Sequence, residues 1–155
     1  MKRIMKLAFA IMLVVLLTGC VGGTKVTKCT VNSDQSVSGY KLKSEYKVYS
    51  KNDVVNKVET TETVTSKNNT ILAYFEKQLK NQYKSYNENY GGYSYKVTNK
   101  NGKVVSKVTI DYSKMNLSKF VKDNPAMKTY TNKENKITLK GINTMYQSMG
   151  ATCDK

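Results

Sequence analysis

Residues 93–110 read YSYKVTNKNGKVVSKVTI, and apolar and polar side chains alternate on both sides of Asn101-Gly102. Alternation with a period of two is typical of a strand that buries one face. Asn-Gly favours the two-residue type I′ turn that joins antiparallel strands. The register set by this turn places Tyr95 opposite Val108, so that apolar side chains meet on one face. The stretch therefore predicts a β-hairpin with a defined register.

Residues 40–64 predict a second hairpin. Their apolar residues fall on even positions both before and after a turn signal at residues 51–53. Directly opposed residues on one face must then have numbers that add to an even sum, which requires an odd-length loop or a β-bulge. A register that pairs Val48 with Val58 and Lys47 with Glu59 meets this requirement.

Between the hairpins, over residues 68–87, the apolar spacing changes to that of a helix. One stripe of this helix contains Leu72, Phe75, Leu79, Tyr83 and Tyr86. A short helix is predicted over residues 118–122, a fifth strand over residues 136–140, and a terminal helix through Ile142 and Met149 that ends at Gly150. These patterns together favour an α+β fold. We expect an antiparallel sheet of about four to five strands, with one long and one short C-terminal helix packed on one face.

Residues 1–19 have the features of a signal peptide. A basic start is followed by an apolar run over residues 7–17, which is shorter than the roughly 20 residues that a membrane-spanning helix needs. The next residues, Leu17-Thr18-Gly19-Cys20, resemble the lipobox of bacterial lipoprotein precursors. The resemblance implies a diacylglyceryl thioether on Cys20, cleavage between Gly19 and Cys20, and anchoring on the extracytoplasmic face of the cell membrane. An ordinary cleaved signal and an uncleaved anchor are the alternatives.

Residues 20–37 are rich in Gly, Ser, Thr and Asn, which predicts a flexible tether ahead of a single domain over residues 38–155. If Cys20 carries lipid, Cys29 and Cys153 remain as an even pair. Outside the cytoplasm such a pair is a disulfide candidate, and two free thiols are the alternative.

The mature chain also resembles the YehR-like small bacterial lipoproteins. The likeness lies in the order of the elements, the Lys- and Tyr-rich hairpin, and the segment Val108-Thr109-Ile110-Asp111-Tyr112. It implies an α+β domain of unassigned activity and supplies no catalytic residue.

The residue types argue against an enzyme. The sequence has no His, no Cys-x-x-Cys and no Gly-rich phosphate loop, so we expect no catalytic residue, no metal site and no cofactor. Glu59 and Glu62 are three positions apart on one strand and therefore point to opposite faces, where we expect both to be solvated surface charges.

The chain has 26 Lys and Arg against 11 Asp and Glu, a formal net charge of +15. Lys41, Lys43 and Lys47 share the polar side of one strand, so they are the candidate contacts for an anionic envelope polymer or lipid headgroups. Nucleic acid is not expected as a partner, because the domain is exported and its Tyr residues occupy apolar positions. Surface charge without any ligand is the alternative.

Three functions follow as hypotheses. The first is a lipid-anchored, non-enzymatic binding or envelope-associated module of unknown ligand. The second is an accessory lipoprotein that docks on an integral membrane protein, and the third is a surface enzyme.

Replacing Cys20 with Ser removes the only thiol at the lipobox. We expect this variant to incorporate no labelled lipid and to accumulate as unprocessed precursor, because a hydroxyl does not replace the thiol as lipid acceptor. Cys29→Ser is the matched control and should incorporate the label normally. Normal processing and membrane retention of the Cys20→Ser variant would contradict the prediction.

Overall fold

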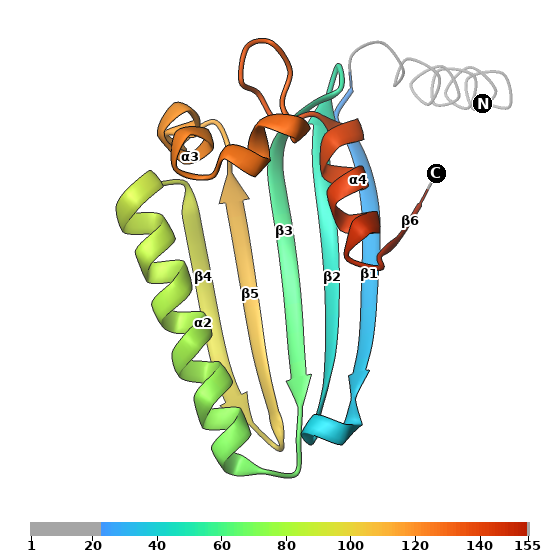
Figure 1. Ribbon diagram of the computed structural model, residues 1–155, viewed down its shortest axis with the longest axis vertical. Helices are drawn as coiled ribbons and strands as arrows, with labels where there is room; N and C mark the ends of the chain where they lie inside the picture. Colours follow the sequence, from blue (N-terminus) through green and yellow to red (C-terminus); the bar gives the residue numbers. More distant parts are fainter. Residues whose placement is uncertain (1–22, 155) are drawn as a thin grey trace, which may run out of the picture.

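A six-stranded antiparallel sheet, ordered β4-β5-β3-β2-β1-β6, forms the body of the computed structural model, which describes residues 23–154 (Figure 1). The helices lie over one face of this sheet, as an α+β fold requires. The strands are β1 Lys25–Gln35, β2 Tyr40–Lys51, β3 Val54–Thr65, β4 Tyr93–Lys100, β5 Lys103–Asp111 and β6 Thr152–Cys153. The helices are η1 Ser36–Ser38, α2 Asn69–Tyr90, α3 Leu117–Asp123, η2 Pro125–Tyr130 and α4 Leu139–Ser148.

The hairpin of β4 and β5 has the predicted register. Tyr95 is directly opposite Val108, and Lys100 is opposite Lys103. Asn101 and Gly102 have φ angles of 54° and 71°, the left-handed conformation that a type I′ turn needs at both central positions.

The hairpin of β2 and β3 also has the predicted register, with Val48 opposite Val58. Its two turn residues, Asn52 and Asp53, both have positive φ angles. A two-residue loop alone would put the apolar sets on opposite faces, and a register shift between Tyr49 and Ser50 corrects this. Of the two arrangements that the even-numbered apolar positions allow, an odd-length loop or a β-bulge, the structure has the bulge.

The flexible tether predicted over residues 20–37 is wrong from Lys25 onwards. Residues 25–35 form β1, which pairs with β2 from Lys25 opposite Ser50 to Gln35 opposite Tyr40. Its inward side chains include Thr27 and Ser33, so the strand does not show the apolar alternation by which strands are recognised. Backbone pairing to a long neighbour makes this strand, and side-chain hydrophobicity contributes less.

The fifth strand predicted over residues 136–140 is also wrong. Ile137 is fully buried and Thr138 follows it, and these two residues form isolated bridges with Thr131 and Val54 but no strand, because α4 begins at Leu139. The Ile137 carbonyl also accepts a hydrogen bond from the Val55 N–H of β3 at 2.9 Å. Thr138 caps the helix by accepting a hydrogen bond from the backbone N–H of Gly141 at 3.0 Å. The two strands missing from the prediction are β1 and the two-residue β6.

The predicted helices are present with longer bounds. In α2, Asn68 caps the first turn by accepting from the Thr70 N–H at 2.8 Å, and the helix ends before Gly91, whose φ is 70°. From the predicted stripe, Leu72 and Tyr83 are buried, while Phe75 and Leu79 are partly buried against the core. The helix at α4 ends near Gly150, where φ is 84°.

The core has two apolar parts. The larger part lies among the sheet, α4 and the loops before it, and includes Val48, Val58, Ile137 and Ile142. The smaller part joins Val64 and Val104 of the sheet to Leu72 of α2. Tyr46 and Tyr146 stack in the larger part, with their ring centroids 4.1 Å apart.

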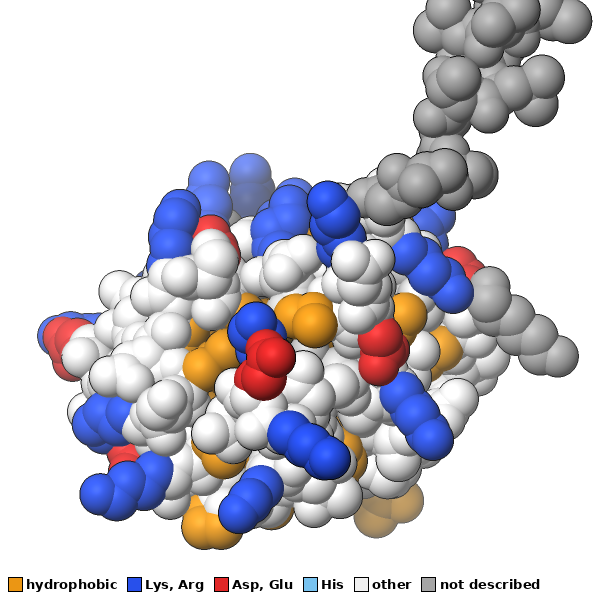
Figure 2. Space-filling view, turned by 90° about the horizontal axis from the view of Figure 1, so that it is seen from above, with side chains coloured by type: hydrophobic (Ala, Val, Ile, Leu, Met, Phe, Trp, Pro, Cys, Tyr) orange, Lys and Arg blue, Asp and Glu red, His pale blue; other side chains and the backbone are white. Residues whose placement is uncertain are grey.

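Figure 2 views the molecule from the end at which β1 begins. Lysine side chains are spread over this view, and acidic side chains lie beside several of them. Among the described residues, no helix is long and apolar enough to cross a membrane.

Candidate functional site

One face of the sheet, which we call the open face, has no helix over it (Figure 1). Because directly paired residues lie on the same face, the pairings identify its side chains. On the side of the β2–β3 bulge away from the turn, they are the even-numbered residues of β1 and β4, the odd-numbered residues of β2 up to Tyr49, and the odd-numbered residues of β3 from Lys57 and of β5. Lysine and threonine dominate this face. Its lysines are Lys28, Lys41, Lys43, Lys47, Lys57, Lys96, Lys100, Lys103 and Lys107, and its acidic residues are Asp34, Glu45, Glu59 and Asp111.

The three lysines predicted from sequence all lie exposed on the open face, but their surroundings differ. Lys41 forms an ion pair with Asp34 at 2.8 Å, and Lys43 forms one with Glu45 at 3.0 Å. Lys47 is directly opposite another cation, Lys28 of β1. Two of the three predicted contacts therefore have a carboxylate partner in an ion pair, and Lys47 lies between a cation, Lys28 of β1, and a carboxylate, Glu59 of β3.

Lysine stands directly opposite lysine at three places on the open face. The pairs are Lys28 with Lys47, Lys96 with Lys107, and Lys100 with Lys103. Side chains in such positions have Cβ atoms about 4.5–5.5 Å apart, and like charges there destabilise a sheet. Replacing one lysine of each pair with a carboxylate would turn this repulsion into attraction.

The nearest carboxylate to the first of these pairs is already engaged. Glu59 accepts hydrogen bonds from Tyr49 Oη and from Lys57 Nζ, both at 2.7 Å, and the Lys57 ammonium lies 4.0 Å from the Tyr49 ring centroid. The hydrogen bonds from Lys57 and Tyr49 lower the pKa of Glu59 below its ordinary value. Glu59 also lies directly opposite Lys47, whose charge adds to the lowering of its pKa, so Lys57, Tyr49 and Lys47 share one carboxylate.

Shallow depressions accompany the lysines on the open face. One of about 310 Å³ lies beside Lys28 and Lys47, and another of about 410 Å³ lies beside Lys96 and Lys107. A third, of about 330 Å³, lies beside Lys41 and Lys43. Threonine side chains between the long lysines line all three depressions, and each depression is also lined by at least one carboxylate, from Asp34, Glu45 or Glu59.

The covered face contains a carboxylate that sequence reasoning placed in solvent. Glu62 and Glu59 do point to opposite faces, but Glu62 is only partly exposed and lies under α2. Its Oε2 accepts hydrogen bonds from Tyr83 Oη at 2.5 Å and from Ser106 Oγ at 3.0 Å. Burial and the charge of Glu62 raise the pKa of Tyr83 well above its ordinary value, so this hydroxyl stays protonated and acts as a donor.

This polar group separates the two apolar parts of the core. Ser44, Glu62 and Ser106 are directly paired across three strands, and Ser44 and Ser106 are buried. The arrangement joins α2 to the sheet through one charged acceptor. Residues 23–154 contain no group of three His, Cys, Asp or Glu side chains that could hold a metal ion.

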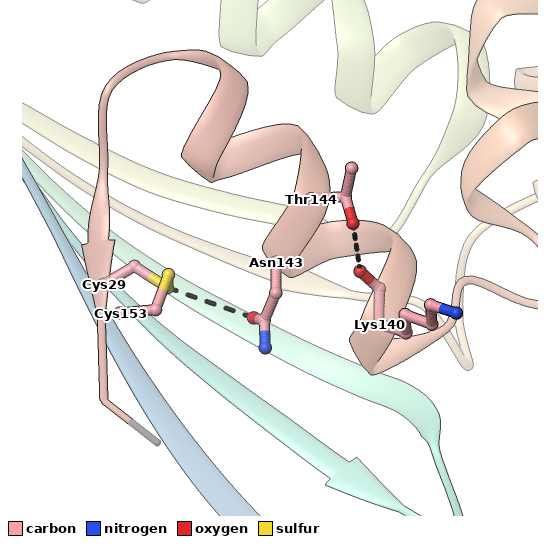
Figure 3. Close-up of a disulfide and its surroundings, with 5 residues drawn as sticks. All are labelled: Cys29, Lys140, Asn143, Thr144 and Cys153. Atoms are coloured by element: carbon pink, nitrogen blue, oxygen red, sulfur yellow. Dashed lines mark hydrogen bonds between the residues drawn. A yellow bond between two sulfur atoms is a disulfide. The ribbon is translucent and has the colours of Figure 1, made fainter.

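A disulfide joins Cys29 and Cys153, which are also directly paired in β1 and β6 (Figure 3). The Cys29 Sγ lies 4.0 Å from Oδ1 of Asn143 on α4. The backbone N–H of Asp154 donates to the Lys28 carbonyl at 2.8 Å. These contacts attach β6, close to the C-terminus, to β1.

Exposed apolar side chains gather at the end of the sheet that holds η1. Val37 is fully exposed and Tyr74 is 60% exposed. A depression of about 370 Å³ lies between η1 and α2, lined by Ser38, Tyr40, Ile71 and Tyr74 among others. A second one, of about 860 Å³, is lined by loop residues of the same end, including Ser66 and Gly102.

The fold and the open face define a class: a small α+β protein with helices on one side of an antiparallel sheet and a basic, uncovered side. The Escherichia coli YehR protein, solved by NMR, shares this fold with a TM-score of 0.57 at 16% identity. The match covers 86% of this chain and 93% of that one. An NMR structure of a Streptococcus pneumoniae TIGR4 protein aligns with a TM-score of 0.48 at 12% identity, over 84% of this chain and 86% of that one. No protein-family model and no curated protein matches the sequence.

Sequence reasoning missed part of this site. Lys28 falls within the predicted tether, and the prediction of anionic contacts did not include Lys96 or Lys107. The register of the second hairpin already placed Lys96 opposite Lys107, so that pair could have been found. The Lys28 pair needed knowledge of β1.

We expect natively prepared, exported protein to weigh about 2 Da less than its reduced form, since a disulfide removes two hydrogens. Reduction should lower the thermal unfolding temperature, because a bridge spanning 124 residues restricts the unfolded chain by up to roughly 4–5 kcal/mol in the chain-entropy model. Reductant should leave the Cys29→Ser, Cys153→Ser double variant unchanged. Two alkylatable thiols at these positions in native protein would contradict the bridge.

Tyr83→Phe should destabilise the protein by about 1.5–3 kcal/mol in urea unfolding, because the Glu62 carboxylate loses a charge-assisted hydrogen bond. Tyr74→Phe removes the same hydroxyl from an exposed ring and should change stability by no more than about 0.5 kcal/mol. Equal, small effects of the two substitutions would show that the Tyr83 contact contributes little.

Proposed function

We propose that this chain is a lipid-anchored, non-enzymatic protein of the extracytoplasmic membrane face, whose open face binds an anionic envelope polymer. The three lysine–lysine pairs on that face carry the proposal. Each pair raises the free energy of the folded protein, and a bound phosphate or carboxylate between the two ammonium groups would reverse the sign of that interaction.

The chemistry of the face favours a repeating anion over a single small ligand. Two of the lysine pairs, at Lys47 and Lys107, are two strands apart, a separation of about 10 Å across the sheet. Lysine presents a point charge without the planar fork by which arginine recognises one carboxylate or phosphate. Shallow depressions and separated point charges favour a flexible polyphosphodiester chain, which would be recognised by its charge density.

The anchoring part of the proposal rests on the resemblance of residues 17–20 to a lipobox. Gly19 and Cys20 lie outside the described residues. Two acyl chains on one Cys would hold a protein stably at a membrane, whereas a single chain gives marginal binding. A lipid anchor would keep the open face close to the polymers of the cell envelope.

A second candidate function is docking on an integral membrane protein. The observation in its favour is the group of exposed apolar side chains around Val37 and Tyr74, since such groups mark interaction sites when they are large enough.

The test uses lipidated protein in a nonionic detergent and soluble poly(glycerol phosphate) as the probe. Replacing one lysine of each pair, as Lys47→Gln, Lys103→Gln and Lys107→Gln together, should weaken binding at low salt by about tenfold or more, which is about 1.4 kcal/mol. The thermal unfolding temperature should stay the same or rise slightly, because the substitutions relieve like-charge repulsion.

The matched control is Lys77→Gln, Lys80→Gln and Lys84→Gln on the exposed side of α2, which removes the same charge from another face. This variant should bind as the wild type does. Absence of wild-type binding at low salt, or equal loss in both variants, would contradict a site on the open face.

A further inference from the structure

The point at which the chain enters the sheet limits how an anchored molecule can stand. β1 is paired to β2 along its whole length, and the disulfide at Cys29 joins it to β6 on the other side. The strand therefore does not peel away to lengthen the link. Only residues 20–24 remain between the lipid site of the proposed function and the first strand residue, Lys25.

This link is short compared with the sheet. Five residues span at most about 18 Å when fully extended. The eleven residues of β1 span about 36 Å, and η1 lies at the far end of that strand. The end that holds η1 cannot be turned toward a membrane to which Cys20 is attached. The end at which β1 begins must lie near it.

The near end has a positive surface. It contains the β2–β3 turn, α3, η2, the loop to α4 and the first turn of α4 (Figure 1). Some of its lysines have carboxylate partners: Lys114 with Asp111, Lys119 with Asp123, and Lys136 with Glu134. In the described part of the chain, other exposed lysines of this end form no ion pair, and these are Lys25, Lys51, Lys122, Lys128, Lys133 and Lys140.

From the short link and these lysines we infer that the near end rests on the anionic phospholipid surface of the membrane that holds the lipid, an inference that depends on the proposed anchoring. Lysines close to an anionic membrane surface are attracted to it, and the attraction falls off within a Debye length. The strands then stand upright on the membrane. The open face looks sideways into the envelope and stays free for the polymer of the proposed function.

The experiment is lysine acetylation of the lipidated full chain, read residue by residue by mass spectrometry. The protein is compared in detergent, in phosphatidylcholine vesicles, and in vesicles with about one third phosphatidylglycerol. Lys51, Lys122, Lys128 and Lys133 should react at least about threefold more slowly on the anionic vesicles than in detergent. Lys67 and Lys77, toward the far end, should react at the same rate in all three.

A charge variant tests the attraction itself. Lys51→Gln, Lys128→Gln and Lys133→Gln together should abolish the extra protection of Lys122 on anionic over neutral vesicles. The control variant, with Lys67→Gln, Lys77→Gln and Lys80→Gln, removes the same charge far from the near end. In this variant the extra protection of Lys122 on anionic vesicles should remain.

The outcomes separate the two proposals. The unlipidated comparison is the Cys20→Ser chain without residues 1–19, so that no apolar signal segment remains to hold it on vesicles. Retention of the wild type but not of this chain on vesicles supports the anchoring. Equal behaviour of these two chains overturns the anchoring and this inference with it. Retention of the wild type with protection of Lys28, Lys43 and Lys47, or with uniform reactivity, overturns the upright orientation alone.

Discussion

The rest of the structure depends on the pairing of β3 with two neighbours at once. β3 joins β2 with Val48 opposite Val58, and β5 with Val58 opposite Ile110 and Val64 opposite Val104. A slip of one residue in either pairing would move an apolar set to the opposite face. The bulge at Tyr49 and Ser50 places the apolar side chains of β2 on the same face as those of β3. One face of the sheet is therefore apolar and packs against helices, and the other face is exposed to water.

The covered face is held by two devices besides apolar packing. Glu62 accepts from Tyr83 and Ser106 at the boundary between the two apolar parts, where an unpartnered carboxylate would be costly. This contact favours one position of α2 along the sheet. At the opposite edge, the bridge between Cys29 and Cys153 attaches the short β6 and the end of α4 to β1, an edge that two strand residues alone would hold weakly. A small domain with modest apolar area gains from both.

The open face shows a different balance. Exposed ion pairs such as Lys41 with Asp34 contribute little to stability, whereas opposed lysines reduce it. The two arrangements occur on the same surface, and the repulsive one recurs across β1–β2 and β4–β5. In the proposed function, an anion bound between opposed lysines would offset this repulsion.

The sequence by itself determined the two hairpins, their registers, the need for either an odd-length loop or a bulge in the hairpin of β2 and β3, the long helix and the terminal helix. These features come from turn residues and side-chain periodicity within stretches of about 25 residues, and the chain between the paired strands is too short to allow another arrangement. Only the tertiary structure decided the strand at residues 25–35, the partner of β3 on its other side, the position of Glu62 beneath α2 and the Lys28–Lys47 pair. Pairing between distant strands is made by backbone hydrogen bonds, which are the same for every residue type and so leave no pattern in the sequence.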